Sequence, residues 1–272
     1  MVFLTFTLSA NAFPTFTRPK PPVGTTQVDL NGIAQLPNCS GSIIRLTNNP
    51  EAKVIVLSNG HCIDLLKPGT YRSDDALNET IGLFGPQSQL VRARSTRVVY
   101  ATMTATDISL IELNVTYKDL QKHNIASFLL SPQVAPPGTP IIMASGYFKT
   151  AVKCKVDALV YQLKEDAWTF MNSYKYSGCD ARHGTSGSPL IAIQTGEIVG
   201  INNTGNDSGE RCTMNNPCEV DKDGKVTVIQ GMNYGQQTNV ILSCVNPQGL
   251  FDLSVAGCVL PGSRRFGAYR LR

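Results

Sequence analysis

The chain has 272 residues, of which 42% are hydrophobic and 16% charged, and its formal net charge is +4. A disordered or coiled-coil protein would carry far more charge, and a mild positive charge without long basic runs gives no case for a nucleic-acid partner. The length is sufficient for one large or two ordinary all-β domains with a substantial core.

The N-terminal part predicts a leader and a linker. Residues 2–9 are apolar and precede a small-residue pattern at 10–12 that suits signal peptidase, so we expect a signal peptide over residues 1–12. No Lys or Arg precedes the apolar stretch, which indicates a signal truncated at its start. Residues 13–27 are rich in Pro and Thr and predict an extended linker or pro-segment. No later stretch reaches the roughly 18 apolar residues of a membrane span, so we expect a soluble mature protein. Together with the expected signal peptide, this predicts a secreted protein, extracellular or periplasmic.

Short apolar runs dominate the chain from residue 28 onward. Between residues 28 and 125 they are strand-sized, rich in β-branched residues and bounded by turn residues, and only 117–124 is expected to form a short helix. Residues 126–140 hold four prolines and a glycine, which predicts a crossover between two halves.

The second half repeats this pattern over residues 141–260, with Asp223-Gly224 as a hairpin turn signal. Two all-β halves joined by a Pro-rich crossover predict two barrels or sandwiches packed together. Residues 261–272 are expected to form a basic, solvated tail.

The eight cysteines predict disulfides rather than a metal site. They contain no C-x-x-C pair, and the three histidines lie far apart in the sequence. Disulfides imply an oxidising compartment. Asp221 and Asp223 alternate but lack the rest of a calcium loop. We therefore expect neither a metal nor any other cofactor.

The strongest chemical signal is Ser186, which has Gly184 and Gly187 close on either side and leads into the apolar run 190–193. Glycines allow unusual backbone angles, so the N–H groups of Gly184 and Ser186 are able to point at one spot. Such a pair holds the negative oxygen that forms when a carbonyl is attacked. The alternative is an ordinary Gly/Ser turn.

A serine nucleophile needs a base, and the base needs a carboxylate that orients it. His61 follows an apolar strand, and Asp107 heads an alternating apolar strand, where a carboxylate is costly without a partner. His123 lies in a polar stretch and is expected on the surface. His183 is three residues before Ser186, near the site but poorly placed as the base. The alternative is that His61 closes a turn and Asp107 is solvated.

Four segments resemble, in this order, the signature segments of trypsin-like serine proteases of the chymotrypsin fold. The segments are 39–43, 58–62, 106–111 and 184–189. The chain order His, Asp, Ser differs from the orders of α/β-hydrolases and subtilisins. The Thr before the nucleophile and the Ser-Pro after it resemble secreted bacterial members.

The resemblance covers roughly residues 28–245 and implies two packed, antiparallel, six-stranded β-barrels. It further implies that Ser186 is the nucleophile, His61 the general base and then acid, and Asp107 the orienting acid. The backbone amides of Gly184 and Ser186 would form the oxyanion hole. The implied protein is a monomeric endopeptidase that acts on polypeptides. A catalytically silent binding module on the same fold is the alternative.

The resemblance also pairs Cys39 with Cys62 beside the catalytic histidine. The other six cysteines allow 15 connectivities. We expect the pairs Cys154–Cys179, Cys212–Cys218 and Cys244–Cys258. The main competing pair is Cys179–Cys212, which would brace the substrate pocket.

The expected substrate-binding residues are Asp180, His183, Asn203, Gly205 and Gly235. Asp180 lies six residues before Ser186, which without gaps is where trypsin carries the Asp at the floor of its pocket. Gly205 and Gly235 fall where that family keeps the pocket walls open. This arrangement implies cleavage after Arg or Lys, because a buried carboxylate recognises a cation.

An equally weighted reading makes Asp180 a loop acid that pairs with Arg182. Cys179 precedes this Asp, whereas the trypsin cysteine follows it, so the loop could be threaded differently. Thr185 replaces the Asp that animal members use to bind a newly cut N-terminus. We therefore expect no zymogen switch of the salt-bridge type.

Overall fold

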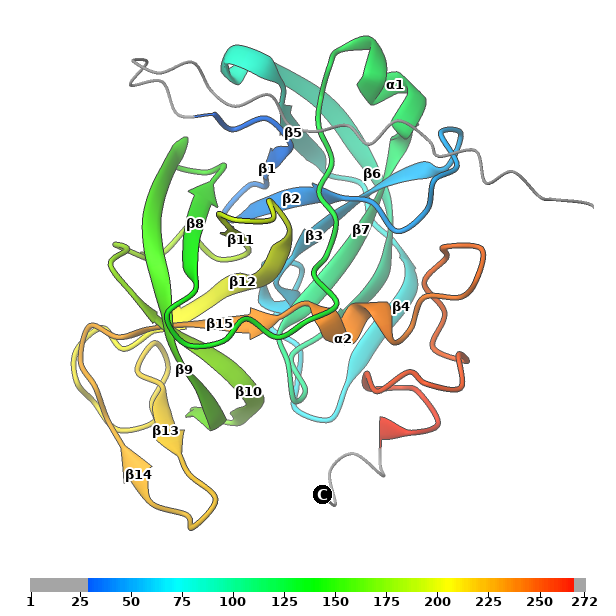
Figure 1. Cartoon of the computed structure of the whole chain (residues 1–272). Helices are drawn as coiled ribbons and strands as arrows, with labels where there is room; N and C mark the ends of the chain where they lie inside the picture. The colour runs from blue at the N-terminus through cyan, green and yellow to red at the C-terminus, as the bar shows by residue number, and fades with distance from the viewer. Residues whose placement is uncertain (1–28, 267–272) are drawn as a thin grey trace, which may run out of the picture.

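The computed structural model describes residues 29–266, and these residues form an almost entirely β structure (Figure 1). The signal and linker segments expected over 1–27 lie outside the described residues, as do the last residues of the basic tail, 267–272. Within the described range, no helix is long and apolar enough to cross a membrane.

The first barrel is a ring of six antiparallel strands. The order is β6-β5-β1-β2-β3-β7, and the pairing of β6 with β7 closes the ring, while β4 adds to the edge of β6. The strands are β1 (Ile33–Gln35), β2 (Ser40–Ile44), β3 (Lys53–Ser58), β4 (Tyr71–Ala76), β5 (Thr80–Phe84), β6 (Leu90–Thr102) and β7 (Ile108–Thr116).

The second barrel closes in the same way. Its order is β10-β15-β12-β11-β8-β9, and the pairing of β9 with β10 completes six strands. The strands are β8 (Pro140–Ser145), β9 (Thr150–Glu165), β10 (Trp168–Ser177), β11 (Pro189–Ala192), β12 (Ile198–Gly205) and β15 (Asn233–Gln237). The predicted fold of two six-stranded antiparallel barrels is therefore confirmed.

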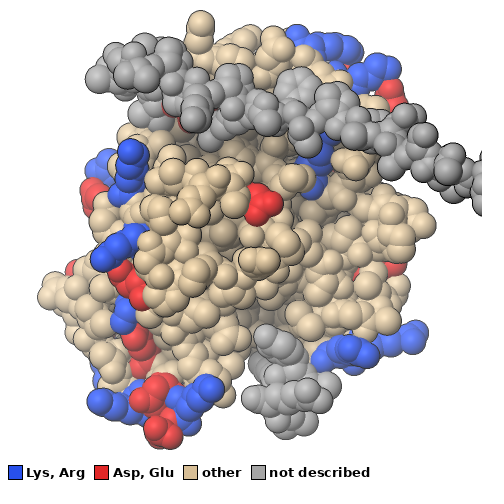
Figure 2. Space-filling view, in the orientation of Figure 1, with Lys and Arg blue, Asp and Glu red and all other residues tan. Residues whose placement is uncertain are grey.

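The remaining elements are short. They are the 3-10 turns η1 (Gly60–Cys62) and η2 (Pro86–Ser88), the helices α1 (Tyr117–Lys122) and α2 (Asn239–Leu242), and the strands β13 (Cys218–Val220) and β14 (Val226–Thr227). The predicted helix over 117–124 is α1, and Thr116 caps it through reciprocal hydrogen bonds with Asp119. The predicted Asp223-Gly224 turn joins β13 to β14, and charged side chains of both signs gather at this end of the molecule (Figure 2).

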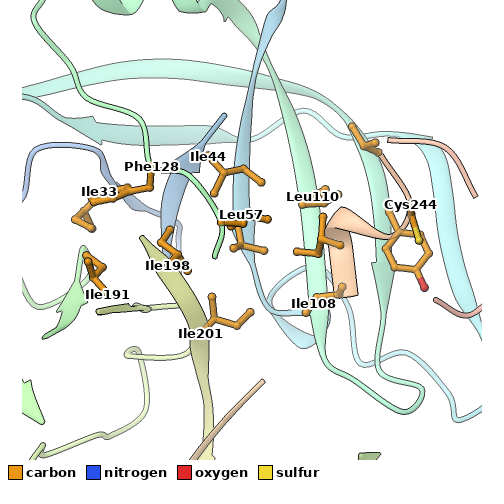
Figure 3. Packing of buried hydrophobic residues seen from close by; sticks show 14 of the residues in the cluster. Ile33, Ile44, Leu57, Ile108, Leu110, Phe128, Ile191, Ile198, Ile201 and Cys244 are labelled. Carbon is orange, nitrogen blue, oxygen red and sulfur yellow. The ribbon is translucent and has the colours of Figure 1, made fainter. Parts of the chain in front are cut away.

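Side chains from both barrels meet in one core cluster (Figure 3). Leu57 and Leu110 come from the first barrel, Ile198 and Ile201 from the second, and Phe128 from the crossover. All are buried, and burying a large aliphatic side chain contributes about 1.5–3 kcal/mol. This shared core fixes the two barrels relative to each other, so residues from both halves are held at one seam.

Two further segments connect the two barrels by hydrogen bonds. The crossover bonds to both barrels, because Phe128 N donates to Ile43 O at 2.8 Å and Ser131 N donates to Ile198 O at 2.9 Å. After β15, the chain returns along the first barrel near β4 (Figure 1), where Tyr100 Oη donates to Pro261 O at 3.0 Å.

All eight cysteines form disulfides. The structure pairs Cys39–Cys62, Cys154–Cys179, Cys212–Cys218 and Cys244–Cys258, which are the expected pairs. The competing pair of Cys179 with Cys212 is not formed, because Cys179 bonds to β9 and Cys212 closes a short loop before β13.

Candidate active site

His61 and Asp107 meet at one end of the first barrel. His61 lies in η1, directly after β3, and Asp107 directly precedes β7, the neighbour of β3. The imidazole Nδ1 lies 2.7 Å from Asp107 Oδ2, and the backbone N–H of His61 donates to Oδ1 at 3.1 Å. The Asp107 side chain is only 1% exposed, so the histidine is its compensating partner.

The backbone around this pair is held by buried hydrogen bonds. Asn59 Nδ2 donates to Asp107 O at 2.8 Å, and Ser109 Oγ donates to Asn59 O at 2.8 Å. Gly60 permits the close approach, since a Cβ there would collide with the carbonyl of Thr102. The strand ends thus fix the imidazole and the carboxylate before any substrate binds.

The charge of Asp107 controls the basicity of His61. Burial works to lower the pKa of His61, but the charge of Asp107, the hydrogen bond to it and the charge of Glu165 raise the pKa, with a net rise above the ordinary value of 6.5. An imidazole in this setting is a stronger proton acceptor than a free one.

Ser186 lies in the tight turn before β11, at the edge of the second barrel. Gly184 and Gly187 both have a positive φ, +99° and +77°. Within residues 29–266, the N–H groups of Gly184 and Ser186 donate to no acceptor. Ser186 O accepts a hydrogen bond from Ser40 N at 2.8 Å, which ties the turn to β2 of the first barrel.

Adding a single methyl group at Gly187 is expected to lower the stability of the protein strongly. A Cβ at Gly187 would collide with Ser40 O and Ser58 Oγ, and the positive φ adds about 1–2 kcal/mol of strain. We expect Gly187→Ala to lower the free energy of unfolding by at least about 2 kcal/mol, measured by denaturant unfolding. The control is Gly196→Ala, which has φ +74° with no atom within 4 Å of its Cβ and should cost about 1 kcal/mol. Equal losses in the two variants would contradict the proposed crowding.

Hydrogen bonds between uncharged groups stabilise the turn that carries Ser186. Thr185 is buried, and its Oγ1 donates to Arg182 O at 2.7 Å and accepts from Asn202 Nδ2 at 2.9 Å. Tyr176 Oη donates to Oδ1 of the same Asn202 side chain. Position 185 therefore stabilises the turn without an ionisable group.

His61, Asp107 and Ser186 line one cleft of about 210 Å³ at the junction of the barrels. No hydrogen bond joins His61 to Ser186 in this structure, and Ser186 Oγ is 3.5 Å from Asn203 O instead. Such bonds often tighten only when substrate binds. The cleft brings together a histidine–carboxylate pair and a serine hydroxyl.

The structure separates the predicted substrate-binding residues into two groups. His183, Asn203 and Gly205 line the cleft, and Asn203 Nδ2 is buried there without a hydrogen-bond partner among the described residues. Gly235 does not line the cleft, because its missing Cβ faces Ile201 O in the neighbouring strand β12.

Asp180 also lies away from the cleft and is exposed. The disulfide Cys154–Cys179 ties the residue before it to β9, and Asn233 Nδ2 donates to Cys179 O at 3.1 Å. These two contacts fix the backbone next to Asp180, whose own side chain is exposed. A carboxylate from position 180 therefore does not form the floor of the cleft in this structure.

Glu165 lines the cleft and was not identified from the sequence. It ends the long strand β9, where one acid among many polar residues carries no motif. It shares the cleft with His61 because the two barrels meet there, as in the 2.7 Å bond from Met171 N of β10 to Ala105 O of the first barrel, so no local signal could have revealed it.

One group in the described range has metal-ligand proximity, namely Cys39, His61 and Cys62. Both sulfurs belong to the disulfide Cys39–Cys62, so neither is a thiolate ligand. This trio therefore does not fit a metal.

Comparison with known proteins gives a domain match. The model of the trypsin-like peptidase domain matches residues 39–201. No curated protein matches the chain.

The comparison with solved structures gives matches to proteases. The MamO protease domain from Magnetospirillum magneticum has 16% identity and a TM-score of 0.51, over 79% of this chain and 96% of that one. A Nocardiopsis protease has 16% identity and a TM-score of 0.45, over 76% and 90% of the two chains. A Glu endopeptidase has 17% identity and a TM-score of 0.45, over 79% and 88%.

Proposed function

Because the chain belongs to the trypsin-like peptidase family, we propose that it is a serine endopeptidase whose catalytic residues are His61, Asp107 and Ser186. The observation that carries this proposal is the 2.7 Å contact of His61 Nδ1 with the buried Asp107, in the cleft that Ser186 also lines. A buried carboxylate paired to a histidine next to a serine is the arrangement that activates a hydroxyl.

The proposed reaction has two halves. Ser186 Oγ attacks the carbonyl carbon of the peptide bond while His61 takes the hydroxyl proton, and a tetrahedral oxyanion forms. His61 then gives this proton to the leaving amine, and the acyl group stays on Ser186. A water molecule, deprotonated by His61, releases the acyl group and restores the serine. Asp107 holds the imidazole and stabilises its positive charge.

The unbonded N–H groups of Gly184 and Ser186 are proposed to bind the oxyanion. Neither has an acceptor within the described range, so neither has to break a protein hydrogen bond to do so. Loss of one such donor lowers kcat by about 10²- to 10³-fold in comparable sites.

The proposed setting is extracellular or periplasmic. Four disulfides join all the cysteines, and disulfides persist in oxidising compartments. We propose a polypeptide substrate and a monomeric enzyme.

A silent binding module is the competing function, favoured by the absence of a hydrogen bond between His61 and Ser186 in this structure. The deciding experiment combines cleavage of a mixed peptide library with stoichiometric labelling by an organophosphonate. An active triad predicts cleavage and one label per chain, located on Ser186 by mass spectrometry. A silent module predicts neither result.

The rise in the pKa of His61 predicts the pH dependence of cleavage. His61 accepts a proton only when neutral, so kcat/KM should rise with pH through the pKa of His61 in the free enzyme. Because this pKa lies above 6.5, the midpoint should lie above 6.5 as well. The measurement uses a peptide without ionisable side chains. A profile that is already flat at about pH 6 would contradict the role of His61 as the base.

A further inference from the structure

Glu165 is a buried carboxylate in the cleft that the proposed reaction does not use. It is 6% exposed and lies at the end of β9, where the chain turns into β10. Buried carboxylates are nearly always paired with a cation. Among residues 29–266, no Lys, Arg or His side chain forms an ion pair with Glu165, and burial raises its pKa.

The hydrogen bonds of Glu165 use only one of its two oxygens. Oε1 accepts from Thr204 Oγ1 at 3.1 Å and from Asn215 N at 2.8 Å. In the described part of the chain, Oε2 accepts no hydrogen bond. It is not one of the polar side-chain atoms that are fully shielded from solvent without a partner. Oε2 is therefore not fully enclosed by protein, and Glu165 is one of the residues that line the cleft.

The cations of the cleft have nearer partners than Glu165. His61 feels the charge of Glu165, but its imidazole is held by Asp107 at 2.7 Å. Arg182 places its guanidinium 4.2 Å from the ring centre of Phe148, and His183 lies 3.2 Å from the carboxylate of Asp207. Apolar side chains line the same cleft as Glu165, together with polar ones. The apolar ones are Leu65, Met103, Trp168, Phe170 and Met214. A side chain with an aliphatic stem and a cationic tip matches these apolar residues and the accessible oxygen of Glu165.

We infer that Glu165 determines specificity by binding, through Oε2, the ammonium of a substrate lysine close to the scissile bond. This inference rests on the proposed peptidase function. The position is close to the bond because Thr204, which Glu165 contacts, directly follows Asn203, whose carbonyl contacts Ser186 Oγ.

The geometry favours lysine over arginine. Two protein donors already occupy Oε1, so the carboxylate cannot offer both oxygens to the planar fork of a guanidinium. The ammonium of lysine is a point charge that needs only one free oxygen.

The test compares the wild type with Glu165→Gln. Glutamine keeps an oxygen that accepts from Thr204 and Asn215, but it removes the charge. Peptide pairs carry lysine or norleucine at one position at a time around the scissile bond, because norleucine lacks only the ammonium. The matched control is Glu197→Gln, which makes the same substitution on the turn between β11 and β12, away from the cleft.

We expect the wild type to prefer lysine over norleucine at one position by about 10- to 100-fold in kcat/KM, with arginine between them. This ratio should fall to near unity in Glu165→Gln and stay unchanged in Glu197→Gln. Thermal unfolding shows whether each variant is folded. If Glu165→Gln fails to fold, the wild-type preference among the peptide pairs remains as the test, and its absence overturns the inference.

Two outcomes overturn the inference. One is a wild-type enzyme that cleaves peptides without preferring lysine at any position, and the other is a preference that persists in Glu165→Gln. Both leave the proposed peptidase function intact. A wild type that cleaves no peptide and takes no organophosphonate label contradicts the proposed function and removes the inference with it.

Discussion

Replacing Ser186 by alanine is expected to lower kcat/KM on any cleavable peptide by about 10⁴- to 10⁶-fold. The variant loses the oxygen that attacks the carbonyl, while the histidine–aspartate pair and the oxyanion N–H groups remain. It should also lose all labelling by the organophosphonate. Its stability should change little, because within residues 29–266 Ser186 Oγ makes a single long contact, 3.5 Å to Asn203 O.

The matched control is Ser188→Ala, two residues along the same turn. Ser188 Oγ is buried and has no hydrogen-bond partner among the described residues, so its removal should neither cost stability nor impair cleavage. If Ser186→Ala kept wild-type activity, the nucleophile would have to be sought elsewhere in the cleft. If both variants lost activity equally, the cause would be a disturbed turn and not the missing hydroxyl of Ser186.

Much of the fold could be predicted because its signals are local. Alternating β-branched runs predict strands, the prolines over 126–140 predict the crossover, and Asp223-Gly224 predicts the turn between β13 and β14. The closure of each ring is not a local property. It came from the resemblance, and the pairings β6–β7 and β9–β10 confirm it.

The candidate triad could be predicted because each member lies in a short motif. The surroundings of the cleft could not, because contacts between distant segments place them. Asp180 has the expected spacing from Ser186, but its side chain is exposed and does not line the cleft, and the neighbouring Cys179 is bonded to β9. Glu165 has no motif, and it reaches the cleft through a hairpin whose register side-chain patterns alone do not specify.

Replacing Asp107 by asparagine is the second prediction with a very large effect. Asp107 accepts from two donors of His61, the backbone N–H at Oδ1 and Nδ1 at Oδ2. An asparagine has only one accepting oxygen, so its NH₂ group would face one of these donors. His61 would then favour the tautomer with the proton on Nε2, which cannot take the proton of Ser186. We expect kcat to fall by about 10⁴-fold.

The pH profile of Asp107→Asn separates this cause from simple unfolding. Without the negative charge of Asp107, the pKa of His61 should fall, since that charge and its hydrogen bond are the larger causes that raise it, ahead of the charge of Glu165. The residual activity should therefore reach its plateau at a lower pH than in the wild type. The control is Asp252→Asn, which removes a partly exposed carboxylate that accepts from Ser254 N at 2.7 Å outside the cleft, and should keep wild-type activity and pH profile. An Asp107→Asn enzyme with an unshifted profile would show that Asp107 does not set the basicity of His61.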